Sequence, residues 1–491
     1  MKKLYFALDS ICGNRWFLLL FVPIAFCFLL LYSYSTSPFY VGNGCDSLIF
    51  KTMGLAILQG KTPYLDLFDH KGPFLYLINA VGQWIVPGRF GIFVLQIVSL
   101  SVSLIFWFKT AKLIGNTLVS FVWVIVALCI MGVFFEGGNL TEEWNLPFIA
   151  ISLYYSISYF VKDSEKQHPI KYSLVYGVCF GMAFFIRPND AVAQIGGVMT
   201  GVTLWLLYKK EYKNAINNAI SFFLGFAIIA IPILVWFAIR GALDEFYYGL
   251  LKFNSMYSEG IASLLRSVIG KEKLKFFMFF VVLCVMVYNS VHKKLLFLMI
   301  PLLLFVVALM GTRPYPHYYI VVAPFFMLFF VFLCVQHNKS IIVCALAVII
   351  ASHIDTLKTA RKTSKIKVKY ALHVLKNGVD EPSSFKETDR ILQFVPKGKR
   401  DQIWNYNLDF DLSMLWRNGL VQANKVPLFS MYLVDNKLKE EDNLIQQKPE
   451  YVLFSDDHSK DSSDYVFILS NYDKVVQTDS TVCRITLFKR K

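Results

Sequence analysis

The chain has 491 residues, of which 56% are hydrophobic, 16% aromatic and 17% charged, with a mean hydropathy of +0.50. A soluble domain cannot bury so much apolar surface, so this composition excludes an ordinary soluble fold and indicates a polytopic integral membrane protein. The net charge of +15 comes largely from Lys and Arg at the ends of apolar runs, which indicates orientation in a membrane rather than nucleic-acid binding.

Apolar runs with almost no charge follow one another along the chain, and most have about the length that a helix needs to cross a bilayer. The first, after Lys2 and Lys3, lacks a clear signal-peptide cleavage site, so we expect it to be a retained helix. We predict about eleven spans, at residues 16–34, 90–108, 118–135, 144–161, 172–186, 191–208, 219–239, 276–291, 295–310, 318–335 and 341–354.

Short basic connections alternate with loops that carry acidic residues or a single Arg, so the positive-inside rule places the amino terminus in the cytoplasm. The apolar run 73–86 is short for a span, and we expect it to be a helix lying along the outer interface. The loops 35–89 and 240–275 are then entirely external. No internal repeat stands out.

After Ile354 the composition becomes polar, with β-prone stretches at residues 401–404, 451–454 and 483–488. These features predict a membrane domain over residues 1–354 and a small soluble α/β domain over residues 355–491. An odd number of spans places the soluble domain outside. The six cations between Lys358 and Lys369 favour the cytoplasm instead, although an external basic segment can meet anionic lipid headgroups.

Candidate catalytic residues begin in the first external loop. Asp46 follows a Gly-Asn-Gly turn and begins a predicted helix over residues 47–58, whose positive end favours an ionised carboxylate. Such a carboxylate can act as a base toward a hydroxyl acceptor, and the alternative is that Asp46 only caps the helix. Asp69, His70 and Lys71 then combine an acid, a titratable ring and a cation that can bind a phosphate, or that only anchors the interface.

The other external loops supply further candidates. Glu142 and Glu143 begin a predicted span, where they complement the helix dipole, orient an acceptor or bind a divalent cation. Arg187 precedes Pro-Asn-Asp and is a turn residue or a phosphate ligand. The segment from Gly311 to Tyr319 presents donors for a phosphate group, or an ordinary aromatic belt, at Arg313, His317 and Tyr318.

Together these motifs resemble the GT-C superfamily of membrane glycosyltransferases, in the bacterial branch akin to the protein O-mannosyltransferases and the aminoarabinose transferases of lipid A. The resemblance rests on Asp46, on the segment from Tyr64 to Pro73, on Glu142 and Glu143, on Arg187-Pro-Asn and on the segment from Arg313 to Tyr318, and it covers nearly the whole chain. It implies a GT-C-like helical membrane fold with interfacial helices in the first external loop. It departs from the commonest pattern because Ser47, not a second acid, follows Asp46.

The resemblance also implies transfer of a sugar from a polyprenyl-phosphate carrier to a lipid, glycan or protein acceptor at the outer face of the cytoplasmic membrane. Asp46 would be the catalytic carboxylate, with Asp69, Glu142 and Glu143 as further acids. Lys71, His70, Arg187, Arg313, His317 and Tyr318 would bind the carrier phosphate. No cofactor is implied beyond a possible divalent cation, and the expected partners are the lipid-linked donor, the acceptor and membrane lipids, with no nucleic acid. We therefore predict that Asp46, Lys71, Glu143 and His317 all emerge at the same, non-cytoplasmic side of the bilayer, close enough to share one lipid-borne phosphate.

Two other classes remain open at this stage. An O-antigen polymerase or ligase is also polytopic and uses polyprenyl-linked glycans, but we expect it to lack both the acidic first loop and the soluble carboxyl-terminal domain. A lipid or solute transporter should show charges within spans or broken helices at the midplane, and neither is visible in the sequence.

Overall fold

The computed structural model describes residues 15–257, 271–309, 315–379, 383–406, 409–427, 431, 434–455, 463–478 and 485–491. The chain divides into two units. Unit 1 comprises residues 1–33, 94–236 and 259–375, and unit 2 comprises residues 34–93, 237–258 and 376–491.

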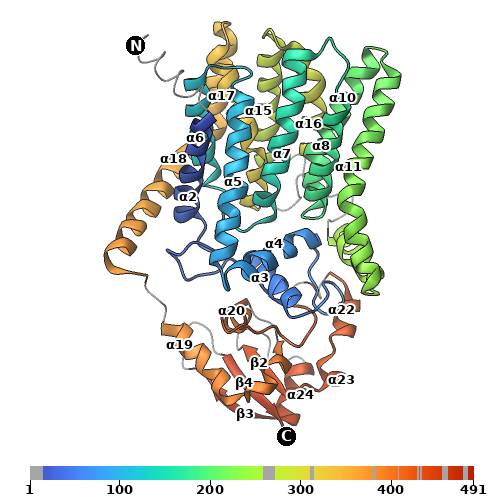
Figure 1. Ribbon diagram of the computed structural model, residues 1–491. Helices are drawn as coiled ribbons and strands as arrows, with labels where there is room; N and C mark the ends of the chain where they lie inside the picture. Colours follow the sequence, from blue (N-terminus) through green and yellow to red (C-terminus); the bar gives the residue numbers. More distant parts are fainter. Residues whose placement is uncertain are drawn as a thin grey trace. The chain divides into compact units, whose positions relative to one another are not determined.

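Unit 1 is made of helices (Figure 1), and every predicted span overlaps one or more of them. Their bounds are η1 (Arg15–Leu20), α2 (Phe21–Tyr32), α5 (Phe90–Ala111), α6 (Thr117–Met131), α7 (Thr141–Ser158), η2 (Tyr159–Asp163), α8 (Ile170–Phe184), α9 (Pro188–Asp190), η3 (Ala191–Gly196), α10 (Gly197–Tyr208), α11 (Tyr212–Ile239), α15 (Lys271–Tyr288), η5 (Lys293–Leu295), α16 (Leu296–Leu309), η6 (Pro316–Val322), α17 (Ala323–Val335) and α18 (Lys339–Asn377).

Four helical segments among the described residues are long and apolar enough to cross a membrane, namely Phe90–Ala111, Pro188–Tyr208, Tyr212–Ile239 and Pro316–Val335. Five shorter apolar helices accompany them, at Trp16–Tyr32, Thr117–Met131, Ile170–Phe184, Phe277–Tyr288 and Lys339–Val348. The chain is therefore a multi-pass membrane protein, although several predicted spans are shorter as helices than the sequence runs imply.

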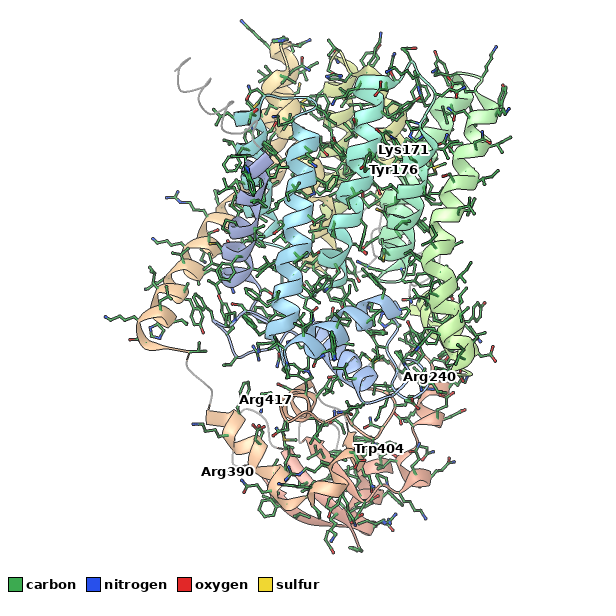
Figure 2. All side chains as sticks on the ribbon, viewed as in Figure 1. Lys171, Tyr176, Arg240, Arg390, Trp404 and Arg417 are labelled. Carbon is green, nitrogen blue, oxygen red and sulfur yellow. The ribbon has the colours of Figure 1, made fainter. Side chains whose placement is uncertain are left out.

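Small residues allow the helices of unit 1 to approach closely. A Cβ atom on Gly177 of α8 would lie 2.0 Å from the carbonyl oxygen of Phe222 in α11. On the same interface, a Cβ atom on Gly225 would lie 2.3 Å from the carbonyl oxygen of Leu174. Only glycine fits at both positions, as is common where membrane helices pack backbone to backbone. Figure 2 labels Lys171 and Tyr176 on α8, the helix that carries one side of this contact.

Unit 2 contains the helices of the predicted external loops 35–89 and 240–275, namely α3 (Cys45–Leu58), α4 (Pro73–Ile85), α12 (Leu243–Tyr247), η4 (Tyr248–Lys252) and α13 (Phe253–Tyr257). Pro73 occupies the first turn of α4, where its missing N–H costs no hydrogen bond. Helices α3 and α4 cross at Gly54, where a Cβ atom would lie 2.7 Å from the backbone nitrogen of Ala80. The two helices predicted in the first loop are thus a tightly packed pair.

The carboxyl-terminal part of unit 2 is a four-stranded mixed sheet in the order β1-β2-β4-β3. Strands β1 (Ile403–Tyr406) and β2 (Tyr451–Ser455) are parallel, and β4 (Ile485–Arg490) is antiparallel to both β2 and β3 (Tyr472–Gln477). The accompanying helices are α19 (Ser383–Arg390), η7 (Ile391–Phe394), η8 (Lys397–Gln402), α20 (Asp409–Arg417), α22 (Asn436–Glu441), α23 (Leu444–Gln447) and α24 (Ser463–Asn471).

Successive side chains of a strand point to opposite faces of the sheet. An apolar cluster covers each of the two faces. Leu453 and Leu487 pack on one face with Leu415 of α20. Trp404, labelled in Figure 2, packs on the other face with Ile468 of α24. The predicted combination of a helical membrane fold with a small α/β region is thus confirmed, while helix α18 runs without a break through residue 354, where we placed the domain boundary.

Candidate functional site

Asp46 lies in the first turn of α3 in unit 2. The N-cap of the helix is Gly44, with φ −73° and ψ 147°, and no side chain caps it. The interpretation of Asp46 as the helix cap is therefore wrong, because its side chain is displaced from the cap position by two residues. The carboxylate is half-buried and makes no hydrogen bond or ion pair with any described residue. It is therefore available to a ligand.

Two cations, the buried Lys51 and the half-buried Arg89, hold the loop that leads into Asp46. The Lys51 Nζ atom donates hydrogen bonds to the carbonyl oxygen of Ser35 at 2.5 Å and to Oδ1 of Asn43 at 2.6 Å. Arg89 donates to the carbonyl oxygens of residues 40, 41 and 42 at 2.7 to 3.1 Å. We call this set, Lys51 and Arg89 with residues 35–43, the loop clamp. The sequence analysis did not predict the loop clamp. The feature of the sequence that could have indicated it is a lysine inside the apolar stretch of α3.

Lys51 is fully buried and has no carboxylate partner among the described residues. Burial, reinforced by the positive charge of Arg89, lowers the pKa of Lys51 well below its ordinary value. Burial also lowers the pKa of Arg89, to about 10, with a further contribution from Arg417. The Lys51 ammonium lies 4.9 Å from the centre of the Trp416 ring of α20, so an aromatic face replaces an acid as its neighbour.

The carboxyl-terminal region reaches the loop clamp through α20. The Trp416 indole N–H donates to Oε1 of Gln83 at 2.8 Å, and the Gln83 amide donates to the carbonyl oxygen of Lys51 at 2.9 Å. Asn43 donates to the Ser413 hydroxyl at 3.1 Å. The sheet region and the first loop therefore form one structure within unit 2, and Figure 2 labels Arg417 at the end of the same helix.

Asp69, His70 and Lys71 form a second cluster in unit 2. Nδ1 of His70 lies 3.3 Å from the Asp69 carboxylate, and its Nε2 atom lies 2.5 Å from the Lys71 ammonium. The Tyr76 hydroxyl donates to Asp69 at 2.9 Å, and Tyr64, at a positive φ of 67°, donates to the carbonyl oxygen of Lys71 at 2.5 Å. The structure thus brings three predicted site residues together and fixes them with two tyrosines.

The pKa shifts of Asp69 and His70 indicate different roles for these two residues. Burial alone would raise the pKa of Asp69, but the hydrogen bond and charge of His70, together with Lys71 and Tyr76, lower it to about 2. Burial and the adjacent Lys71 charge lower the pKa of His70, an effect that Asp69 and Asp46 oppose. A neutral His70 ring can accept a hydrogen bond from Lys71, so it directs the ammonium. Asp69 is already engaged by three neighbours and is better suited to holding this arrangement than to taking a proton.

In unit 1, Glu142 forms an ion pair with Arg187, whose Nη1 atom also lies 3.5 Å from Asp190. Pro188 begins the short helix α9 directly after Arg187, which turns the chain at this point. The Arg187 guanidinium carbon lies 4.2 Å from the centre of the Tyr318 ring. The structure thus brings Glu142, Arg187 and Tyr318 together.

Glu143 is buried separately, at the start of α7 and outside the span predicted from Trp144. The Gln96 amide lies 2.9 Å from both of its carboxylate oxygens, and the backbone N–H of Asn139 donates to it at 2.7 Å. Burial raises the pKa of Glu143 to about 7, which these hydrogen bonds oppose. No cation within the described chain pairs with this carboxyl group.

His317 pairs with Glu136 and stacks on Tyr315, with 5.5 Å between ring centres. Arg313 lies outside the described residues. No group of three His, Cys, Asp or Glu side chains that could hold a metal ion occurs in the described ranges. Of the predicted residues, Glu142, Arg187 and Tyr318 form one group in unit 1, and the His317 ring packs edge-to-face against Tyr318 with 4.9 Å between ring centres. Glu143 has other partners.

A family model described as "Putative competence-induced protein Ccs4 N-terminal domain" matches residues 17–343, more than half of the chain. The chain belongs to this family. No curated protein matches it.

Among solved structures, the chain is similar to ArnT from Cupriavidus metallidurans in the apo state, with a TM-score of 0.61 and 13% identity over 96% of this chain and 97% of ArnT. The structure of the same protein bound to undecaprenyl phosphate gives a TM-score of 0.57 and 12% identity over the same shares. At these identities the likeness shows the fold alone: the chain shares the ArnT fold over nearly its whole length.

Proposed function

We propose that the chain is a glycosyltransferase that moves a sugar from a polyprenyl-phosphate carrier to a lipid, glycan or protein acceptor. The observation that carries this proposal is the half-buried carboxylate of Asp46 at the end of a clamped loop, which no described residue engages by a hydrogen bond or ion pair. It is supported by a GT-C fold over nearly the whole chain, shared with an ArnT structure that contains undecaprenyl phosphate.

In the proposed reaction the acceptor hydroxyl oxygen forms a bond to the anomeric carbon as the bond from that carbon to the phosphate oxygen breaks. The polyprenyl phosphate leaves with the bonding electron pair and needs no proton. Asp46 takes the proton of the attacking hydroxyl group, so one base is sufficient. The remaining requirement is positive charge against the leaving phosphate.

Lys71 is suited to that second task. It is half-buried, and His70 directs its ammonium by accepting one of its three N–H groups. Arg187 makes both of its ion pairs through Nη1, which fixes the guanidinium while its other donors remain for a phosphate oxygen. We assign Lys71 and His70 in unit 2, and Arg187, Arg313, His317 and Tyr318 in unit 1, to phosphate binding, each on the chemistry of its own unit. Asp69 positions His70 in unit 2, Glu142 positions Arg187 in unit 1, and Glu143 remains a further acid of unit 1.

The test is Asp46→Asn in membranes supplied with a radiolabelled polyprenyl-phosphate sugar. The amide keeps the size of the side chain but cannot accept the proton, so transfer should fall by about 100-fold or more while donor binding persists. Asp66→Asn is the matched control, because Asp66 is an exposed acid of the same loop that accepts from the backbone of Thr62 at 2.6 Å. Transfer by Asp46→Asn at the level of this control would reject the assigned base.

We further propose that the first loop, and the carboxyl-terminal region with it, face the outside of the cytoplasmic membrane. Cys45 provides the measurement, because it is exposed and directly precedes Asp46. An impermeant thiol reagent applied to intact cells should label wild-type protein and lose most of that labelling in Cys45→Ser. Labelling of Cys45 only after the membrane is opened would place the loop inside.

A further inference from the structure

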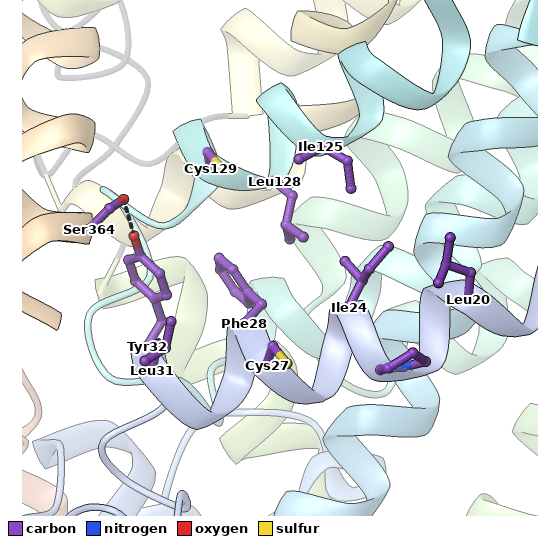
Figure 3. A pocket seen from close by; sticks show the side chains of 11 residues that line it. Leu20, Ile24, Cys27, Phe28, Leu31, Tyr32, Ile125, Leu128, Cys129 and Ser364 are labelled. Atoms are coloured by element: carbon purple, nitrogen blue, oxygen red, sulfur yellow. Dashed lines mark hydrogen bonds between the residues drawn. The ribbon is translucent and has the colours of Figure 1, made fainter. Parts of the chain in front are cut away.

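An apolar groove of about 440 Å³ lies in unit 1 between α2 and α6 (Figure 3). Ile24, Cys27 and Phe28 form its wall on α2, and Ile125 and Cys129 form the facing wall on α6. Its volume is in the range of small-ligand pockets, and its walls offer almost no polar surface.

One end of the groove is polar. The hydroxyl groups of Tyr32 and Ser364 are joined by a hydrogen bond of 2.5 Å, drawn in Figure 3, which links α2 to α18. The Tyr32 ring stacks on Phe28 with 4.7 Å between ring centres. Gly132 admits this ring, because a Cβ atom there would lie 2.6 Å from it. The polar end is therefore a built feature of the groove.

Cations of α18 flank that polar end. Arg361 lies one helical turn before Ser364, while Lys362 and Lys365 lie within two positions of it. All three are exposed and form no ion pair with any described residue. An apolar groove thus ends at two hydroxyl groups beside three uncompensated positive charges.

We propose that this groove binds one anionic phospholipid, with an acyl chain along α2 and α6 and the phosphate beside Ser364 and the three cations. The groove extends from Leu20 to Tyr32, about 18 Å at 1.5 Å per residue, close to the roughly 15 Å of hydrocarbon in one leaflet. That length fits a chain that ends within its own leaflet. The charge selects an anionic headgroup, and a tyrosine at the headgroup level is typical of membrane interfaces.

The experiment measures binding of phosphatidylglycerol and phosphatidylcholine to delipidated full-length protein in detergent by native mass spectrometry. Each cation near a headgroup contributes about fivefold in affinity, so the wild type should bind phosphatidylglycerol about 100-fold more tightly than phosphatidylcholine. The combined variant Arg361→Gln, Lys362→Gln, Lys365→Gln should lose this preference. A matched variant carrying Lys171→Gln, Lys210→Gln and Lys213→Gln removes the same charge from exposed positions elsewhere in unit 1 and should keep it.

A second variant tests the groove itself. Cys27→Phe fills the groove from an exposed position and should weaken binding of both lipids at least tenfold, whereas Cys344→Phe, at an exposed position outside the groove, should not. Equal affinity for the two lipids, or full phosphatidylglycerol binding by the α18 variant, would overturn the proposal. So would undecaprenyl phosphate binding in the groove while phosphatidylglycerol does not.

Discussion

The carboxyl group of Glu143 gives the most quantitative prediction. Its pKa is raised to about 7 from an ordinary value of 4.5, primarily by burial. This difference corresponds to about 3 kcal/mol between the two protonation states. Because the folded chain binds the proton more tightly than the unfolded chain, this stabilisation is fully present below pH 4.5 and is lost as the pH rises to about 7.

The perturbation is Glu143→Gln, which keeps the shape and removes the titration. The side-chain oxygen of the new amide can still accept from the Asn139 backbone, and Gln96 can rotate its own amide to accept from the new NH₂ group. We expect the variant to be more stable than the wild type above pH 7, by up to about 3 kcal/mol, and nearly equal to it at pH 4.5.

The assay is thermal unfolding of the detergent-solubilised protein followed by intrinsic fluorescence at several pH values between about 4.5 and about 8.5, which bracket the raised pKa. The difference in Tm between variant and wild type should grow across this interval and then level off. A matched variant at the adjacent acid, Glu142→Gln, should instead be less stable than the wild type at pH 7, because it loses the Arg187 ion pair. A constant Tm difference for Glu143→Gln would refute the reasoning.

Three other predictions follow from the same geometry. Lys51→Met should lower kcat for transfer by about 10- to 100-fold with little change in KM for the donor, because the loop clamp loses the two hydrogen bonds that Lys51 donates. A change in KM alone would contradict this role. Arg187→Lys should instead raise KM for the donor by about tenfold, since it loses the planar donor set stacked on Tyr318, as a donor titration would show. Gly177→Leu should reduce the yield of folded protein in size-exclusion chromatography, with Gly196→Leu, where a Cβ atom meets nothing closer than 3.8 Å, as the milder control.

The helices of the membrane unit were predictable because a bilayer demands long apolar segments whose backbone hydrogen bonds are internal. The same reasoning found α3 and α4, whose starts are marked by Gly-Asn-Gly and by Gly-Pro. It missed β3, since Tyr472–Gln477 is an edge strand with mostly exposed side chains and no clear apolar alternation. It also ended the last span at Ile354, because the basic residues that follow hide the continuity of a 39-residue helix.

The candidate site was predictable in its residue types and much less in its contacts. Asp69, His70 and Lys71 are adjacent in sequence, so their proximity needs no fold. The link between Arg187 and Glu142 joins residues 45 positions apart, and nothing in the two motifs specifies it. The role of Lys51 was not predicted for a different reason. A lysine in an apolar helix is usually expected to extend its ammonium to the membrane interface. Here the ammonium is buried inside unit 2, where it donates to the backbone carbonyl of Ser35.

The chemistry of the loop clamp fits the proposed base. A buried lysine is usually stabilised by a carboxylate, which here would place a second negative charge beside the loop that carries Asp46. Lys51 and Arg89 bind carbonyl and amide oxygens instead, and an aromatic face completes the surroundings of Lys51. The loop is therefore fixed by neutral acceptors. This arrangement explains how Asp46 can be held in place while its own carboxylate has no partner within the described residues.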